Sequence, residues 1–131
     1  MPSHFDFDFD NKIIRCRVDG VVTDDSLREH YREIAAHGAA RPTFRGLLDM
    51  SGVTALNVTS NTIRELAALP PAIPDPDVPR VIVAGSAQMF GMARMFELQG
   101  AETRPNLHVV RTERDAFAIL GVRSPEFSQH G

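Results

Sequence analysis

Segments with strand periodicity alternate with segments of helical periodicity along this chain. Between residues 5 and 20 apolar residues recur at every second position, which predicts a hairpin that turns near Asp10 and Asn11. Runs at 44–50, 80–84 and 107–110 are short and apolar, as expected of buried strands. Helical stretches separate these runs. The order predicts an α/β fold, with a mixed, mostly parallel sheet of about five strands, an N-terminal β-hairpin and about four helices.

Capping residues locate the first two helices. Thr23 is the expected N-cap of a first helix, and Gly38 lies where a left-handed C-cap is favoured. After the run at 44–50, a segment rich in Ser, Gly, Thr and Asn predicts a turn. Asn57 is the expected cap of the second helix, in which Thr62 and Glu65 have the spacing of a capping box.

The second half of the chain continues the alternation. Five prolines fall between Pro70 and Pro79, which predicts a surface loop. A third, strongly apolar helix follows Ser86 and ends near Gly100, and Thr112 is the expected cap of a fourth. From Arg123 onward we expect a frayed tail.

Length and composition describe one globular unit. The 131 residues predict a single domain spanning 1–131, with its core at about 5–121 and a tail at 122–131. The net charge of −3 is spread along the chain without a basic stripe, so nucleic acid is not an expected partner. No apolar run reaches the roughly 20 residues of a spanning helix. We therefore expect a cytoplasmic protein without membrane insertion.

No residue pattern typical of a metal site, a cofactor site or a catalytic centre emerges. Cys16 is expected in the core, and a solvated face is expected for Asp6, Asp8 and Asp10. The histidines are scattered and expected at the surface; they are His4, His30, His37, His108 and His130. The sequence contains no GxSxG, GxxxxGK[ST] or GxGxxG. An enzyme remains the third hypothesis, resting on Asp49, Ser51 and Ser86 without an accompanying base.

Three segments together resemble a known family. Leu47–Ser60 is similar to the signature of STAS domains, the fold of anti-sigma-factor antagonists, and Ile13–Thr23 resembles the STAS strand that precedes helix one. Phe90–Glu97 resembles a motif of the SpoIIAA-like branch, whose members are related in fold to STAS and Sec14-type lipid-binding domains. The resemblance covers about residues 5–121 and implies SpoIIAA-like (STAS) topology.

The chain departs from the family where the regulatory members are phosphorylated. Those proteins carry a serine after an aspartate at the start of helix two, and the corresponding residues here are Asn57 and Val58. Val58 has no hydroxyl, so the family's phosphorylation switch is not expected. Thr59 and Ser60 offer nearby hydroxyls, which we interpret as helix caps.

Two functional hypotheses follow, and neither is catalytic. The first is a STAS-like protein-interaction or regulatory module that binds a protein partner or itself through the turn after 44–50, the second helix and the third helix. A homodimer is expected through an exposed apolar face of the third helix. The alternative is a Sec14-like carrier or sensor of a small apolar or lipid-like ligand. The candidate interaction or ligand surface comprises Asp49, Ser51, Asn57, Thr59, Ser60, Met89, Phe90, Met92, Arg94, Met95 and Phe96.

Overall fold

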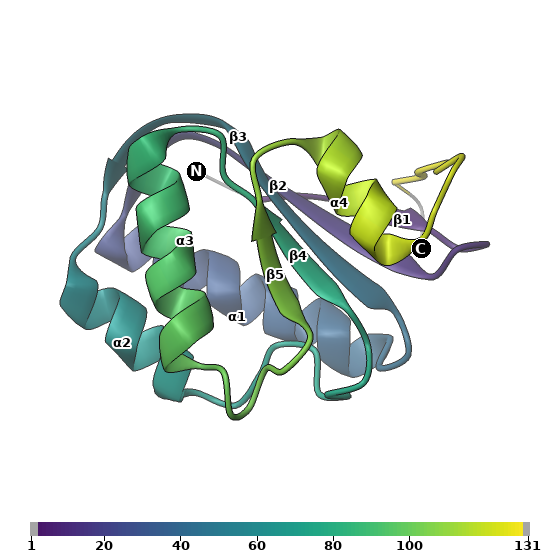
Figure 1. Cartoon of the computed structure of the whole chain (residues 1–131), viewed down its shortest axis with the longest axis horizontal. Helices are drawn as coiled ribbons and strands as arrows, with labels where there is room; N and C mark the ends of the chain where they lie inside the picture. Colours follow the sequence, from purple (N-terminus) through teal and green to yellow (C-terminus); the bar gives the residue numbers. More distant parts are fainter. Residues whose placement is uncertain (1–2, 130–131) are drawn as a thin grey trace.

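One five-stranded sheet organises the chain. The computed structural model describes residues 3–129, and its strands are β1 (His4–Asp8), β2 (Ile13–Thr23), β3 (Arg45–Asn57), β4 (Arg80–Val83) and β5 (Leu107–Val110). They lie side by side in sequence order, with β1 antiparallel to β2 and each later pair parallel (Figure 1). The predicted mixed, mostly parallel sheet with an N-terminal hairpin is confirmed.

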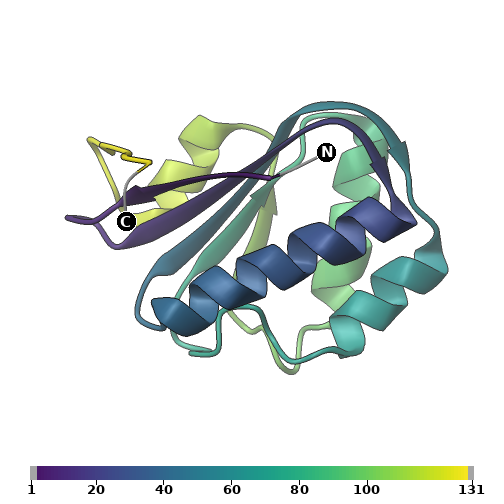
Figure 2. The same cartoon turned by 180° about the vertical axis from the view of Figure 1, so that it is seen from behind.

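Helices cover both faces of this sheet unequally. They are α1 (Asp24–Ala40), α2 (Ser60–Ala68), α3 (Ala87–Gln99) and α4 (Glu113–Leu120), and the prediction of four helices is confirmed. The first three pack on one face, which we call the three-helix face, and α4 packs on the other, the α4 face (Figures 1 and 2).

Alternation along the strands divides the core into two parts. On β2, Cys16 and Val18 belong to the core of the three-helix face, whereas Ile13 belongs to the core of the α4 face. On β4, Ile82 and Val83 divide in the same way. The parallel strands are therefore buried on both faces, which explains why β4 is apolar throughout its last three residues.

Helix α1 continues past its predicted end. Thr23 is the N-cap, as predicted, and its hydroxyl accepts a hydrogen bond from the Ser26 backbone N–H at 3.2 Å. The predicted C-cap at Gly38 is wrong, because the helix runs to Ala40. Gly38 is buried within the helix, where a Cβ atom would lie 2.1 Å from the carbonyl oxygen of Ala72. Glycine is needed there for close approach of another backbone segment.

Strand β3 extends through the segment whose composition predicts a turn. Residues 52–57 pair with the second half of β2, from Asp19 opposite Gly52 to Thr23 opposite Asn57. A Cβ atom at Gly52 would lie 1.9 Å from an oxygen of Asp19, so this glycine serves packing between strands. The predicted turn is wrong because the parallel neighbour supplies the strand's hydrogen-bond partners.

Thr59, and not Asn57, caps α2. The Thr59 hydroxyl accepts a hydrogen bond from the Thr62 backbone N–H at 3.3 Å, whereas Asn57 is the exposed last residue of β3. The predicted capping box of Thr62 and Glu65 is also wrong. Thr62 is buried inside the helix, and Glu65 accepts from Arg28 of α1 at 2.9 Å.

Two of the three hairpin aspartates are buried, which contradicts the predicted solvated face. Arg15 stands opposite Asp6 in the register of β1 and β2, and its Nε and Nη2 each donate to Asp6 at 2.8 Å. Asp8 is 1% exposed and accepts from the backbone N–H groups of Asn11 and Glu126, each at 2.9 Å. The two carboxylates tolerate burial because these donors satisfy them.

Residues 122–129 pack against the sheet, so the predicted frayed tail is wrong for this segment. Val122 is buried in the core of the α4 face, and the guanidinium carbon of Arg15 lies 3.7 Å from the ring centroid of Phe127. Phe7 and Ser128 exchange two backbone hydrogen bonds of 2.8 and 2.7 Å. Residues 130 and 131 lie outside the described residues.

Candidate ligand-binding cavity

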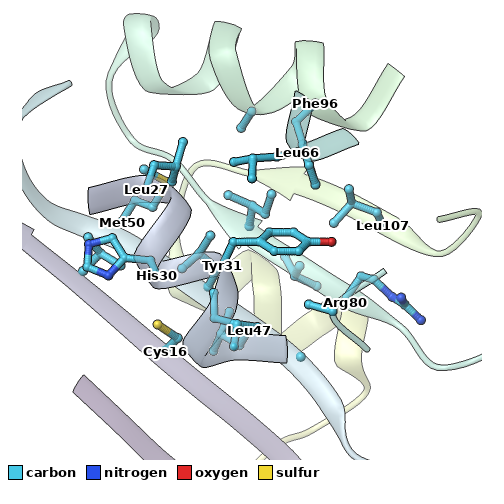
Figure 3. Close-up of a pocket in the computed structure, with 18 of the residues that line it drawn as sticks. Cys16, Leu27, His30, Tyr31, Leu47, Met50, Leu66, Arg80, Phe96 and Leu107 are labelled. Atoms are coloured by element: carbon cyan, nitrogen blue, oxygen red, sulfur yellow. The ribbon is translucent and has the colours of Figure 1, made fainter. Parts of the chain in front are cut away.

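A cavity of about 150 Å³ lies between the three-helix face of the sheet and helices α1, α2 and α3 (Figure 3). Strands and helices both contribute to its lining, which is predominantly aliphatic. The lining includes Cys16, Val18, Met50, Leu56, Val58, Leu27, Ile34, Ile63, Leu66, Met89, Met92, Ala93, Phe96 and Leu107.

Regular periodicities bring these side chains together. On α3 the lining residues Met89, Met92, Ala93 and Phe96 follow the i, i+3, i+4, i+7 spacing of one helix face. On β2 the lining residues occupy every second position. Ala93 is buried within the α3 stripe and adds little side-chain volume, which helps to leave the space open.

Arg104 closes one side of the cavity by capping α2. Its guanidinium donates to the carbonyl oxygens of Ala67 at 2.8 Å and Leu69 at 3.0 Å, near the end of that helix. It also donates to the hydroxyl of Tyr31 on α1 at 2.8 Å. A cation at a helix C-terminus satisfies orphan carbonyls and interacts favourably with the helix dipole. Arg104 therefore fixes α2 relative to α1.

Arg80 forms hydrogen bonds with the proline-rich loop next to the cavity. Its Nη1 donates to the carbonyl oxygen of Ile73 at 2.7 Å, and its Nη2 donates to that of Val78 at 2.9 Å. Ile73 is buried and belongs to the cavity lining. Gly46 makes room for it, because a Cβ atom there would lie 2.3 Å from Ile73 Cδ1. The loop at 70–79 thus forms part of the cavity wall.

His30 also belongs to the lining, and its burial contradicts the predicted surface position. It is 2% exposed, and its Nδ1 lies 2.5 Å from the hydroxyl oxygen of Ser3. Among the buried side-chain nitrogen and oxygen atoms of residues 3–129, His30 Nε2 is the one that has no hydrogen-bond partner. Leaving such an atom unpaired costs about 1–3 kcal/mol. Burial lowers the pKa of His30 from its ordinary 6.5, so the ring is neutral at pH 7.

Cys16 lies in the core, as predicted, and its side chain lines the same cavity. Burial raises the pKa of this thiol to about 12. A thiolate is the reactive form of cysteine, and it is scarcely populated near pH 7 at such a pKa. Cys16 therefore contributes an apolar, uncharged surface to the cavity.

The predicted site residues of α3 divide between the cavity and the outside. Met89, Met92 and Phe96 line the cavity. Phe90 is half-buried, and the guanidinium carbon of Arg111 lies 4.4 Å from the centroid of its ring. The remaining two are Met95, which is half-buried, and Arg94, which is exposed and forms an ion pair with Glu97.

The predicted site residues of β3 and α2 do not line the cavity. Ser51, Asn57, Thr59 and Ser60 are exposed, and Asp49 is buried beside the α4 face. Sequence reasoning also missed the contributions of β2 and α1, because Cys16 and His30 carry no motif. The signal that was available is the apolar periodicity itself, which does not distinguish a filled core from a hollow one.

A buried ionic network occupies the α4 face. Arg15 links Asp6 to Glu113 of α4, with a distance of 3.2 Å between Arg15 Nη1 and Glu113 Oε2. Burial and the neighbouring Asp49 carboxyl raise the pKa of Glu113, while Arg15 opposes this effect. Arg17 also contacts Asp6, at 3.2 Å. The network connects β1, β2 and α4.

The residues of the enzyme hypothesis have structural roles. Asp49 Oδ1 accepts a hydrogen bond from the Ser51 backbone N–H at 2.9 Å, and the Ser86 hydroxyl caps α3 by accepting from the Met89 N–H at 3.1 Å. Across residues 3–129, no group of three or more His, Cys, Asp or Glu side chains is arranged to hold a metal ion. No helix in that range is long and apolar enough to cross a membrane.

No protein-family model matches the chain, and no curated protein matches it.

Proposed function

We propose that this protein binds a small, mainly apolar molecule in the cavity between the three-helix face and α1–α3, as a carrier or sensor. The observation that carries the proposal is a cavity of about 150 Å³ with a predominantly aliphatic lining. Apolar cavities of about 150 Å³ stay dry and bind molecules the size of benzene. The cavity therefore favours an apolar ligand of roughly that size over a charged one.

The energetic cost of an empty cavity supports the same proposal. Apolar side chains that border an unfilled space lack van der Waals partners on that side. Typical domains have only about 5–15 kcal/mol of stability in total, and cavity-filling substitutions are readily available. A bound molecule would recover much of this cost by restoring contacts with the lining.

The resemblance to STAS domains is compatible with a ligand-binding role. The residue that corresponds to the phosphorylated serine of the regulatory proteins is Val58, and Val58 belongs to the cavity lining. An apolar side chain at this position favours contact with a ligand over phosphorylation. The proposal therefore develops the carrier or sensor hypothesis, which rests on the relationship to Sec14-type domains.

Toluene is a suitable probe, because it is close in size to benzene. We expect toluene to bind and to perturb the NMR signals of methyl groups that line the cavity, such as those of Leu56 and Ala93. At a free concentration about ten times Kd, toluene should stabilise the protein by about 1.4 kcal/mol. Saturating toluene without methyl perturbation or stabilisation would refute the proposal.

A matched pair of variants ties binding to the cavity. Ala93→Leu fills part of the cavity, so it should weaken toluene binding at least tenfold and raise stability by about 0.5–2 kcal/mol. Ala118→Leu makes the same change at an exposed position of α4 and should leave toluene affinity unchanged. Equal toluene affinity in both variants would place binding elsewhere.

Self-association remains a second candidate function. Leu98 of α3 is 65% exposed, and a contact with a second copy of the chain through this helix would bury it. Met92, in contrast, lines the cavity, so a substitution at Met92 is a poor test of that contact. Light scattering after size-exclusion chromatography should show a dimer, and Leu98→Lys should weaken it. A wild-type monomer at high micromolar concentration would remove this candidate.

A further inference from the structure

We propose that the proline-rich loop at 70–79 opens and closes the cavity, and that Arg80 is the side chain that holds this loop closed. A ligand then enters and leaves when the loop moves away from the helices and the sheet. This inference rests on the proposed function, because it concerns access to the same ligand site.

The first observation is the place of the loop in the cavity wall. The loop connects α2 to β4 across one end of the sheet (Figures 1 and 2). Ala72 and Ile73 of the loop belong to the cavity lining, and Ile73 is 5% exposed. Opening of the loop would therefore remove part of the wall without unfolding a strand or a helix.

The second observation is that few backbone hydrogen bonds hold this loop. Five of the residues at 70–79 are prolines, which have no N–H group to donate. Among the described residues, its backbone-to-backbone hydrogen bonds join Val78 to Asp75 at 3.3 Å and Gly46 to Pro79 at 3.2 Å. Helices and paired strands have continuous hydrogen-bond ladders, whereas lids are drawn from the least stable segments of a fold. The loop is therefore better suited to open than the strands and helices of the wall.

The third observation is that Arg80 attaches the loop to the sheet. Arg80 is the first residue of β4 and is 7% exposed. Its guanidinium donates hydrogen bonds to three carbonyl oxygens of the loop, those of Ile73, Asp75 and Val78. Hydrogen bonds from a charged donor are stronger than those from a neutral one. Loss of this guanidinium would therefore favour opening more than the loss of one neutral donor.

Asn106 supplies a second, weaker attachment of the loop. Its side-chain Nδ2 donates to the carbonyl oxygen of Pro76 at 2.8 Å, and Asn106 directly precedes β5. Asn106 does not belong to the cavity lining. Removal of this amide therefore weakens the attachment of the loop without changing the shape of the cavity.

The rates of toluene exchange test this inference, because a loop that opens transiently changes entry and exit by the same factor. Asn106→Ala removes one neutral hydrogen bond, so it should raise the association and dissociation rate constants of toluene about fivefold and change Kd less than twofold. Arg80→Met should raise both rate constants at least tenfold. NMR exchange measurements on the methyl groups of Leu56, which lines the cavity, give these rate constants.

Arg45→Met is the matched control for the loss of a guanidinium. Arg45 also donates to backbone carbonyl oxygens, those of Asn11 and Leu120, but it lies outside the cavity lining. The control variant should leave both rate constants within about twofold of wild type. If Arg80→Met does not fold, the comparison of Asn106→Ala with wild type and Arg45→Met decides the test.

The outcomes separate this inference from the proposed function. Binding of toluene at the same rates in wild type, Asn106→Ala and Arg80→Met would overturn the role of the loop and leave the ligand site intact. An equal acceleration in Arg45→Met would also overturn it, because general loosening of the fold would then control access. Failure of the wild type to bind toluene would overturn both proposals.

Discussion

Asp6 and Arg15 illustrate how single residues set the stability of the hairpin. Burial raises the pKa of Asp6, but hydrogen bonds and charge interactions with Arg15 and Arg17 outweigh it, and the net pKa lies below the ordinary 3.8. A carboxyl whose pKa is lowered on folding stabilises the protein above its unfolded pKa. That stability is lost as the pH falls through the folded pKa.

Asp6→Asn should therefore reduce both stability and its acid dependence. At pH 7 we expect a loss of about 3 kcal/mol, because Arg15 loses its bidentate carboxylate partner within the sheet. Below the ordinary pKa of 3.8 the difference from wild type should shrink. Chemical denaturation at pH 7 and at low pH measures both effects.

Asp10→Asn is the matched control, because Asp10 is exposed in the turn of the same hairpin. It should change stability by less than about 0.5 kcal/mol at pH 7. An equal loss in both variants would show that net charge, and not the ion pair, controls the stability of the hairpin.

At the scale of elements, two helical glycines have different roles. Gly38 of α1 contacts the backbone of the loop after α2, whereas a Cβ atom at Gly91 of α3 would meet nothing within 4 Å. Glycine inside a helix otherwise lowers stability by about 1 kcal/mol relative to alanine. Packing thus explains the glycine at position 38. At position 91, packing does not require a glycine.

We therefore predict opposite effects of the same substitution. Gly91→Ala should stabilise the protein by about 0.5–1 kcal/mol, and Gly38→Ala should destabilise it by about 1–3 kcal/mol because of the clash with Ala72. Denaturant unfolding of the two variants measures both changes. Stabilisation by Gly38→Ala would contradict the close packing of α1 against the loop.

Local sequence signals were sufficient to locate some helix caps but not the end of β3 or the burial of Asp6. Thr23 and Thr112 cap helices as the sequence predicts, because a local hydrogen bond determines the cap. The turn predicted after Met50 failed because pairing with β2 overrides the local preferences of Ser51–Asn57. The burial of Asp6 escaped prediction because it depends on cross-strand register with Arg15.

At the scale of the whole molecule, the alternation of strands and helices predicted the α/β sheet, but not the cavity. The sequence indicated the apolar stripe of α3, and Met89, Met92 and Phe96 of this stripe line the cavity. Whether such a stripe meets a filled or a hollow core depends on volumes contributed by α1, α2 and the proline-rich loop. Ile73 and His30 also belong to the cavity lining, although the sequence around them gave no indication of a cavity.

A crystal structure of the protein exposed to toluene would show whether the cavity on the three-helix face holds a small apolar molecule. We expect density for one toluene molecule bounded by Leu56, Met89 and Ala93, with the sheet unchanged. Density that shows Met89, Met92 and Phe96 filling the space, without toluene, would refute the ligand site.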